Sequence, residues 1–258
     1  MMDPVLHLER RDDVALLSLD RPERLNAIGS DTVALLHAAL DQIEADGSLR
    51  AIVVTGVGRA FSAGADISEL DTLRSGADFS RFVKGLTDAF DRLAECATPS
   101  IAAINGIALG GGCELALACD LRLAAPNARL GVPEVKLGLL PGAAGTQRLA
   151  RLLPAAVAKH MLMTGAPLSA DAALSHGLIN AIHDDVVGAA LELAHNIAAG
   201  PPRALAAAKQ LVDAGIEMSL TDGIVFERET VSRLFDTSDR VEGIAAFNAK
   251  RQPTFTGR

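Results

Sequence analysis

Residues 105–120 have the sequence N-G-I-A-L-G-G-G-C-E-L-A-L-A-C-D, in which three consecutive glycines separate an apolar run from a helix-forming run. Glycine allows backbone dihedrals that a side chain forbids, and it lets a ligand approach the main chain closely. The helix predicted to begin at Gly111 directs its free N–H groups and the positive end of its dipole at the space above this corner. The corner therefore suits an anion, or an oxygen that acquires negative charge, and it holds Glu114 near the same point.

The same glycines are equally compatible with a tight turn that only caps a buried helix of small residues. The corner is not a phosphate-binding loop of the G-x-x-x-x-G-K-[ST] type, because no Lys-Ser or Lys-Thr follows, and it does not contain G-x-G-x-x-G. Its functional meaning therefore depends on other segments of the chain.

The length and composition of the chain favour one globular enzyme. A chain of 258 residues, of which 49% are hydrophobic, is long enough for one sizeable core with a smaller appended region. Because Trp and Tyr are absent, we expect any pocket to be lined by aliphatic groups and Phe. The formal net charge of −8 argues against a nucleic-acid-binding surface, which needs clustered Lys and Arg.

The cysteines and histidines indicate neither a disulfide framework nor a metal site. Cys96, Cys113 and Cys119 form no C-x-x-C pair and are odd in number, so we expect reduced, buried thiols in a cytoplasmic protein. The six histidines lack paired ligand spacing, so no metal is expected. The first residues lack the features of a signal peptide, and no apolar run is long enough to cross a membrane.

The first half of the chain repeats a unit of strand, small-residue corner and helix, and we expect these units to stack with their corners on one side. The predicted strands are 5–10, 14–19, 51–55, 101–104 and 121–125. The predicted helices are 30–46, with Ser30 or Asp31 as its cap, 78–97 and 111–119.

The second half is predicted to be almost wholly helical. Residues 126–141 contain three prolines and are expected to be irregular. The expected helices are 142–153, 155–163, 169–176, 185–199, 202–215, 218–235 and 239–250, interrupted by a short strand at 179–182. The segment A-G-P-P at 199–202 predicts a boundary between regions 1–199 and 200–258, and the apolar residues of the second region need a partner surface.

A second small-residue corner, S-A-G-A-D at 62–66, also precedes a helix. If the two corners meet, two main-chain N–H groups can converge on one oxygen, which is the arrangement that stabilises an oxyanion at about 2.7–3.1 Å. Backbone amides suit this task because they are rigidly directed and cannot be lost by ionisation.

Glu114 and Glu134 are candidate carboxylates for acid–base chemistry. Two glutamates that flank a polarised carbonyl compound could hold a water and transfer a proton, and mutual burial would divide them into one acid and one base. Spacing alone leaves simpler roles open. Glu114 could merely complement the helix dipole, and Glu134 could be a solvated loop acid.

Five motifs carry a family resemblance. They are R-P-E-R-L-N-A from residue 21, R-A-F-S-A-G-A-D-I from 59, residues 105–120, V-P-E-V-K-L-G-L-L-P-G-A-A-G-T-Q-R-L from 132 and A-F-N-A-K-R from 246. Through these motifs, in this order, the chain resembles the enoyl-CoA hydratase/isomerase (crotonase) family over essentially its whole length, and is most similar to the family's hydratases.

The resemblance implies an α/β fold in which a spiral of ββα units, 1–199, carries the active site. A helical C-terminal region, 200–258, would then assemble the chain as a homotrimer or a dimer of trimers. The implied substrate is an acyl-CoA thioester, with coenzyme A as part of the substrate and no further cofactor, no nucleic acid and no membrane as partners. Ala65 and Gly111 match the two amides that hold the thioester oxygen, and Glu114 and Glu134 match the two catalytic glutamates. The positions that match contacts to coenzyme A or the acyl group are Arg24, Leu25, Ala63, Asp66, Ile67, Gly142 and Lys250, the last of which could serve a neighbouring subunit.

The implied reaction is the hydration of a 2-trans-enoyl-CoA to a 3-hydroxyacyl-CoA. Glu114 is assigned as the base that activates water toward C3 and Glu134 as the acid that protonates C2, with a shared or concerted proton scheme as the alternative. A Δ3,Δ2-enoyl-CoA isomerase, which needs one carboxylate, and a non-catalytic acyl-CoA-binding member of the family are the other functions that fit. Residues 71–82, where family members differ most, do not reveal the acyl chain length.

Overall fold

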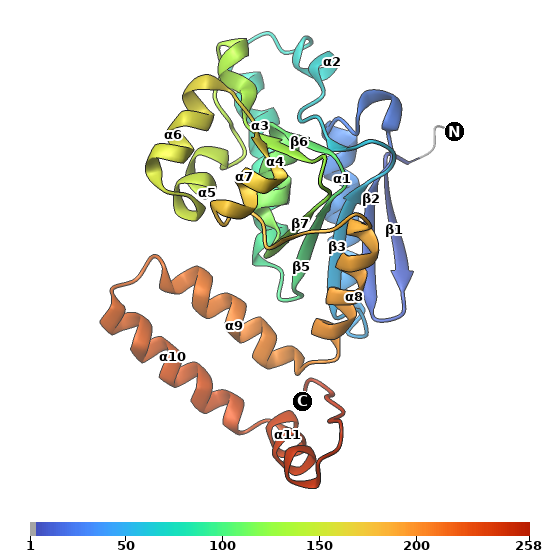
Figure 1. The fold of residues 1–258 in the computed structure, drawn as a ribbon, viewed down its shortest axis with the longest axis vertical. Coiled ribbons are helices and arrows are strands. Elements are labelled where there is room, and N and C mark those ends of the chain that lie inside the picture. The colour runs from blue at the N-terminus through green and yellow to red at the C-terminus, as the bar shows by residue number, and fades with distance from the viewer. Residues whose placement is uncertain (1–3) are drawn as a thin grey trace.

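The structure of the protein is a computed structural model that describes residues 4–258. Its centre is a six-stranded sheet with the order β1-β2-β3-β5-β7-β10 (Figure 1). The first two strands form an antiparallel hairpin, and every later neighbour pairs in parallel. The strands are β1 (Leu6–Arg11), β2 (Val14–Leu19), β3 (Ala51–Gly56), β5 (Ser100–Ile104), β7 (Leu121–Ala124) and β10 (Ala181–Ile182).

Both faces of this sheet are covered, as the continuous apolar strands predict. Alternate residues of a strand point to opposite faces. Ile52 and Val54 of β3 therefore pack into the core formed with α1 (Ser30–Ala45) and α3 (Gly76–Glu95). Val53, between them, belongs to a separate core with α8 (Val186–Ala198) on the other face.

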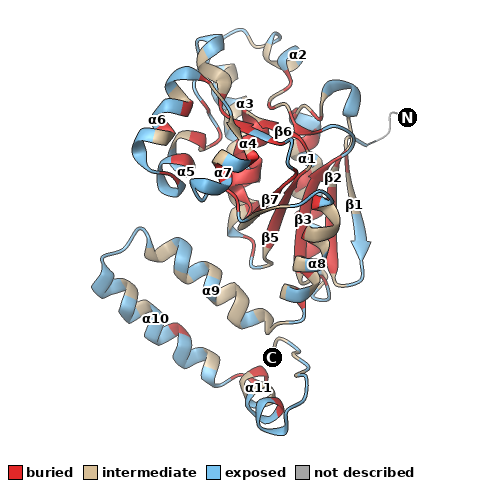
Figure 2. Ribbon diagram, viewed as in Figure 1, coloured by how far each residue is buried: buried red, intermediate tan, exposed pale blue. Residues whose placement is uncertain are grey.

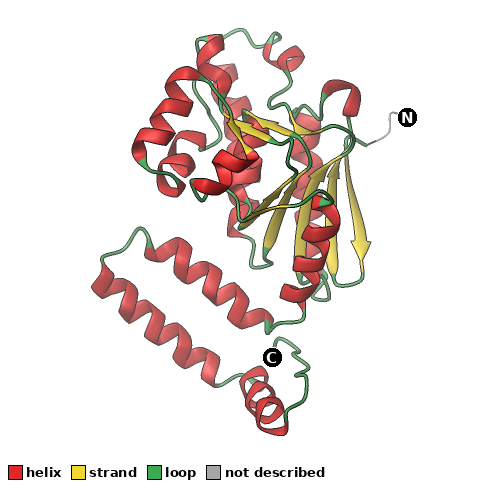
Figure 3. Cartoon of the chain, viewed as in Figure 1, coloured by secondary structure: helices red, strands yellow, loops and turns green. Residues whose placement is uncertain are grey.

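A second sheet of four short strands, in the order β4-β6-β8-β9, lies beside the first (Figure 3). These strands are β4 (Ala60–Ser62), β6 (Ile107–Leu109), β8 (Arg129–Gly131) and β9 (Leu168–Ser169). Each of the first three follows a strand of the large sheet, and β4 and β6 lead on to helices, so the predicted spiral of ββα units is confirmed.

The prediction that residues 126–141 are irregular is wrong. They contain β8 and a 3-10 helix, η2 (Pro133–Leu137). A three-residue strand is stabilised by its neighbours rather than by its own pattern, and the same reason explains why β4 and β6 were not predicted. The predicted cap of α1 is also wrong, because Gly29 precedes its first residue, Ser30.

The helix that follows the three glycines, α4 (Gly111–Ala118), is entirely buried and packs against β4 and β6 of the small sheet and against α3 and α5 (Figure 2). The remaining helices are close to their predicted ranges: α5 (Gly145–Leu152), α6 (Ala155–Thr164), α7 (Ala170–Ser175), α9 (Pro202–Gly215), α10 (Leu220–Phe235) and α11 (Ser238–Ala249). A short helix, η1 (Pro22–Arg24), was not predicted, whereas α2 (Ile67–Leu70) begins directly after the 62–66 corner, where a helix was expected.

Helices α9 and α10 form an antiparallel pair that extends away from the sheets; most residues of α10 are exposed, and those of α9 are mostly of intermediate burial (Figure 2). The last helix that packs on the large sheet, α8, ends at Ala198, so the predicted boundary falls in the connection between α8 and α9. The division into two regions stays a prediction.

Within residues 4–258, no helix combines the length and the apolar character needed to cross a membrane. The part of the chain that the structure describes also contains no group of three or more His, Cys, Asp or Glu side chains placed to hold a metal ion. All three cysteines are free and buried.

Candidate active site

The two small-residue corners meet. Gly64 has φ +106°, and a Cβ built on it would lie 3.2 Å from the amide nitrogen of Gly111. A Cβ built on Gly111 would lie 3.4 Å from the amide nitrogen of Ala65. The amides of Ala65 and Gly111 are therefore neighbours, although the two residues lie far apart in the chain.

Main-chain hydrogen bonds hold both corners in place. The Ile28 amide donates to the Gly64 carbonyl at 2.8 Å, and the Asp66 amide donates back to the Ile28 carbonyl at 2.9 Å. On the other side, the Gly110 amide donates to Gly131 of β8 at 2.9 Å. Neither the Ala65 nor the Gly111 amide has an acceptor among residues 4–258, so two fixed donors face the same space.

Glu114 is placed by the first turn of α4 and is 2% exposed. Its Oε1 accepts hydrogen bonds from the amides of Ala143 at 2.8 Å and Gly145 at 2.9 Å. Burial, opposed by the bond from Gly145 and increased by the negative charge of Glu134, raises the pKa of Glu114 to about 7. A carboxyl group with such a pKa can accept or donate a proton near neutral pH.

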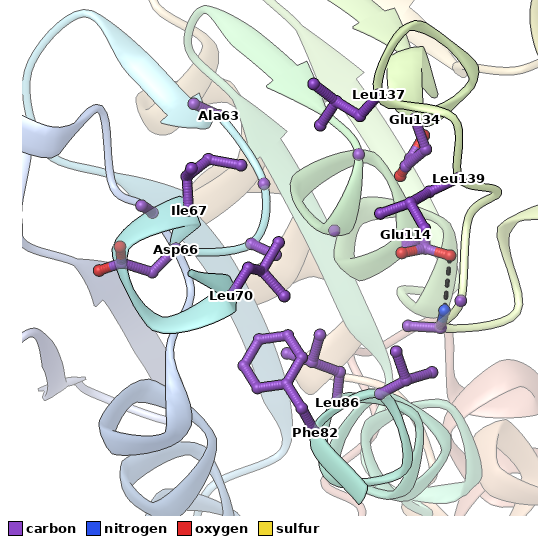
Figure 4. Close-up of a pocket in the computed structure, with 18 of the residues that line it drawn as sticks. Ala63, Asp66, Ile67, Leu70, Phe82, Leu86, Glu114, Glu134, Leu137 and Leu139 are labelled. Atoms are coloured by element: carbon purple, nitrogen blue, oxygen red, sulfur yellow. Dashed lines mark hydrogen bonds between the residues drawn. The ribbon is translucent and has the colours of Figure 1, made fainter. Parts of the chain in front are cut away.

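Glu134 comes from the short helix η2, in the segment predicted to be irregular. Its Oε2 is buried and has no hydrogen-bond partner within the described residues, and its Oε1 lies 3.0 Å from the Cβ that an alanine at Gly110 would carry. Burial raises the pKa of this carboxyl as well. The two glutamates lie on the same side of one cavity (Figure 4).

This cavity has a volume of about 270 Å³ and also contains the corners at Gly64–Ala65 and Gly110–Gly111. Apart from the glutamates, its walls are mostly apolar and come from α2, α3 and the loop after η2 (Figure 4). The larger apolar residues include Leu70, Phe79, Phe82, Leu86, Leu137, Leu139 and Leu140. The arrangement therefore combines an oxyanion site, two acids and an apolar slot.

Five of the predicted contact positions line the cavity: Arg24, Ala63, Asp66, Ile67 and Gly142. The carboxylate of Asp66 is itself engaged, because it accepts from the Ser68 amide at 2.9 Å and from Arg21 at 2.5 Å. A hydrogen bond from the Ser68 hydroxyl, together with those from Arg21 and the Ser68 amide, lowers the pKa of Asp66 and keeps it charged. Asp66 thus fixes the start of α2 at the rim of the cavity.

Leu25 and Lys250 are not among the residues that line the cavity. Leu25 has φ +52°, and its carbonyl accepts the amide of Ala63, so it supports the corner from behind. Lys250 ends α11, in the C-terminal region beyond α9 and α10 (Figure 1). A contact of either residue with coenzyme A stays a prediction.

The sequence does not single out the amides of Ala143 and Gly145, which hold Glu114 in the structure. A Cβ on Gly145 would lie 2.8 Å from Glu114 Oε1, so glycine is needed for this approach. The run P-G-A-A-G at 141–145 was a visible signal of an unusual backbone, but only the fold relates it to Glu114.

Known proteins resemble the chain in sequence and structure. The model of the enoyl-CoA hydratase/isomerase family matches residues 9–258. A "short-chain-enoyl-CoA hydratase" of Clostridium acetobutylicum is 39% identical over 248 residues, or 95% of each chain. A "probable enoyl-CoA hydratase" of Mycobacterium tuberculosis is 40% identical over 253 residues, or 97% of each. The crystal structure of an enoyl-CoA hydratase from Bacillus anthracis superimposes with a TM-score of 0.95 at 36% identity, covering 98% of this chain and 100% of that one.

Proposed function

The chain belongs to the enoyl-CoA hydratase/isomerase family, and we propose that it is a hydro-lyase that adds water across the C2=C3 bond of a 2-trans-enoyl-CoA to give a 3-hydroxyacyl-CoA. The observation that carries this proposal is the position of Glu114 and Glu134 in one cavity beside the free amides of Ala65 and Gly111. Coenzyme A is part of the substrate, and the reaction needs no other cofactor.

The two amides polarise the thioester carbonyl and draw electron density from the C2=C3 bond. Donors already directed at the oxygen that gains charge need no reorganisation during the reaction, and one such donor contributes ~10²–10³ in rate in other enzymes. The apolar wall formed by residues such as Phe82 and Leu139 suits the acyl chain and excludes bulk water.

Glu114 is the base that activates water toward C3, and Glu134 is the acid that delivers a proton to C2. Burial raises the pKa of both carboxyl groups, and the negative charge of Glu134 adds to the rise at Glu114. The two amide bonds to Glu114 favour its carboxylate form, which supports its assignment as the base. Glu134 has an unpartnered buried oxygen, which favours its protonated form.

A Δ3,Δ2-enoyl-CoA isomerase is the second candidate function. Isomerisation needs one carboxylate to move a proton between C2 and C4, so the second buried glutamate has a use only in hydration. A non-catalytic acyl-CoA-binding protein would need neither acid buried in the cavity.

The proposal includes a homotrimer or dimer of trimers and a location in the cytoplasm. The assembly is supported by large apolar side chains exposed on α9 to α11, among them Ile216, Leu220 and Phe247. Three free buried cysteines fit a reducing compartment.

The reaction is tested by following the loss of the conjugated-enoyl absorbance of crotonyl-CoA, in parallel with a 3-enoyl-CoA substrate. We expect rapid hydration, and Glu114→Gln and Glu134→Gln should each lower the rate by ~10²–10⁴. Glu9→Gln, an exposed glutamate on β1, is the control and should retain the parent rate.

Two results would contradict the proposal. If both glutamine variants hydrate as fast as the parent, the assigned roles are wrong. If the parent converts the 3-enoyl-CoA and leaves crotonyl-CoA unchanged, the protein is an isomerase.

A further inference from the structure

Helix α2 forms one wall of the cavity, although none of its residues is buried. Ile67, Ser68 and Leu70 line the cavity, and Ile67 is 53% exposed. Leu70 of α2 and Phe82 of α3 point into the same space from two sides of the apolar slot (Figure 4). A helix of four residues is not stable by itself, so specific contacts must fix the position of this wall.

The residues just before α2 are held by main-chain bonds that do not involve the helix. The Asp66 amide donates to the Ile28 carbonyl at 2.9 Å, and the Ile28 amide donates to the Gly64 carbonyl at 2.8 Å. Ala65 lies between Gly64 and Asp66, so its oxyanion-site amide keeps its place whatever the position of the rest of α2.

Glu69 fastens α2 to the start of α1, on the side away from the cavity. Its Oε2 accepts a hydrogen bond from the Ser30 amide at 2.9 Å, and its Oε1 accepts one from the Ser30 hydroxyl. Glu69 is not among the residues that line the cavity. Ser30 is the first residue of α1, a helix of 16 residues that packs into the core, so Glu69 ties a poorly packed helix to a firmly packed one.

The residue before α1 is a glycine that leaves room for this carboxylate. Gly29 provides no side-chain cap for α1, and a Cβ built on it would lie 2.8 Å from Glu69 Oε2. The φ of Gly29 is −117°, which any residue can adopt, so the contact with Glu69 is what a side chain here would disturb. Glu69 therefore satisfies a first-turn amide of α1 that Gly29 cannot satisfy.

We propose that Glu69 is a positioning residue that sets the width of the apolar slot, and with it the discrimination among acyl chain lengths, by holding α2 against the start of α1. The inference rests on the proposed action on an acyl-CoA. Glu69 does not touch the substrate and acts through Ile67 and Leu70, which line the slot. Without the Glu69 carboxylate only the start of α2 is fixed, so the helix can move outward. A long acyl chain then gains room, and a short one loses its contact with Leu70.

Steady-state kinetics with crotonyl-CoA and 2-trans-decenoyl-CoA test this role. In Glu69→Ala, the KM for crotonyl-CoA should rise by about 5-fold, the typical size of a lost helix cap, with kcat nearly unchanged. The ratio of kcat/KM for the decenoyl substrate to kcat/KM for crotonyl-CoA should rise by at least the same factor. Asp71→Ala removes an exposed carboxylate at the end of the same helix and is the matched control, which should keep the parent ratio.

Glu69→Gln keeps an oxygen acceptor for the Ser30 amide and should retain the parent ratio. An unchanged ratio in Glu69→Ala overturns the proposal, whatever the loss of rate, because a loss of folded enzyme lowers the rates with both substrates equally. If Glu69→Ala does not fold, Gly29→Ala carries the same test. It leaves Glu69 in the chain but places a methyl group where the carboxylate lies, so it should shift the ratio in the same direction.

Binding without turnover separates this inference from the hydratase assignment. Butyryl-CoA and decanoyl-CoA have no double bond to hydrate, and isothermal titration calorimetry measures their affinities for the parent and for Glu69→Ala. A rise in the affinity for decanoyl-CoA relative to butyryl-CoA supports the role of Glu69 even if crotonyl-CoA is not hydrated. An unchanged relative affinity overturns that role even if hydration is confirmed.

Discussion

At the scale of single residues, Glu114 determines the properties of the site. The fold buries this side chain and offers it two backbone amides, so its carboxylate is hydrogen-bonded but poorly solvated. Burial has the larger effect, because the pKa of Glu114 is raised from 4.5 to about 7. A group of this kind is useful in proton transfer and costly for stability.

Because burial of the charged Glu114 carboxylate costs free energy, Glu114→Gln should change the stability of the protein in a pH-dependent way. Because the folded-state pKa is raised, the folded protein binds more protons than the unfolded chain between pH 4.5 and about 7, and stability is lost as the pH rises through this window. The substituted glutamine can accept hydrogen bonds from the same two amides through its carbonyl oxygen, and it carries no charge. The variant should match the parent near pH 4 and exceed it by up to about 3 kcal/mol near pH 8.

This difference is measured by urea unfolding of the parent and the variant at both pH values. Glu9→Gln, which changes an exposed carboxylate, should have the same free energy of unfolding as the parent at both pH values. A stability gap in Glu114→Gln that is the same at pH 4 and pH 8 would show that the fold does not penalise the charged form.

At the scale of secondary-structure elements, the decisive feature is the contact between two strand-to-helix corners. Gly64 and Gly110 both have positive φ, at +106° and +51°, so both corners use conformations that favour glycine. The two corners are close enough that an added methyl group at Gly64 would lie 2.8 Å from the carbonyl oxygen of Leu109. A side chain at Gly64 would therefore displace the second corner.

Gly64→Ala should therefore separate the amides of Ala65 and Gly111. We expect kcat to fall by ~10²–10³, as in the loss of one oxyanion donor, with a smaller change in KM. Gly177→Ala is the control, because Gly177 also has positive φ (+76°) but nothing lies within 4 Å of the added methyl group. Steady-state kinetics with crotonyl-CoA measure both variants. Equal losses of kcat in Gly64→Ala and Gly177→Ala would show that backbone strain, and not the oxyanion site, causes the effect.

At the scale of the whole molecule, the C-terminal helices stand apart from the sheets and present apolar residues to the solvent (Figures 1 and 2). Phe247 of α11 is 83% exposed. Exposed apolar surface of this extent is typical of an interface between subunits. The assembly inferred above would bury it.

Phe247→Glu should weaken that assembly, because it places a charge where a partner would pack. We expect the parent to elute with a mass of three or six chains in size-exclusion chromatography with light scattering, and the variant to shift toward smaller species. Met163→Glu changes a side chain on α6 that is 75% exposed and lies outside the C-terminal region, so it is the control. A parent with the mass of one chain would contradict the proposed assembly.

Local patterns predicted the long elements of this fold well. The strand at 51–55 and the helices between 185 and 250 were located within a few residues, since continuous apolar runs and helical periodicity are properties of neighbouring residues. The strands of the small sheet were missed. Ala60–Ser62 and Ile107–Leu109 are too short to have a pattern, and they form strands because other parts of the chain pair with them.

The amino-acid sequence alone determined the two glycine corners, the place of Glu114 in the first turn of a helix, and the family to which the chain belongs. Only the tertiary structure decided that the two corners touch, that Glu114 and Glu134 share a cavity, and that the amides of Ala143 and Gly145 hold the buried carboxylate of Glu114. The physical reason is that dihedral preferences and periodicity act between neighbours. The burial, field and hydrogen bonds that tune a carboxylate come from segments that only folding brings together.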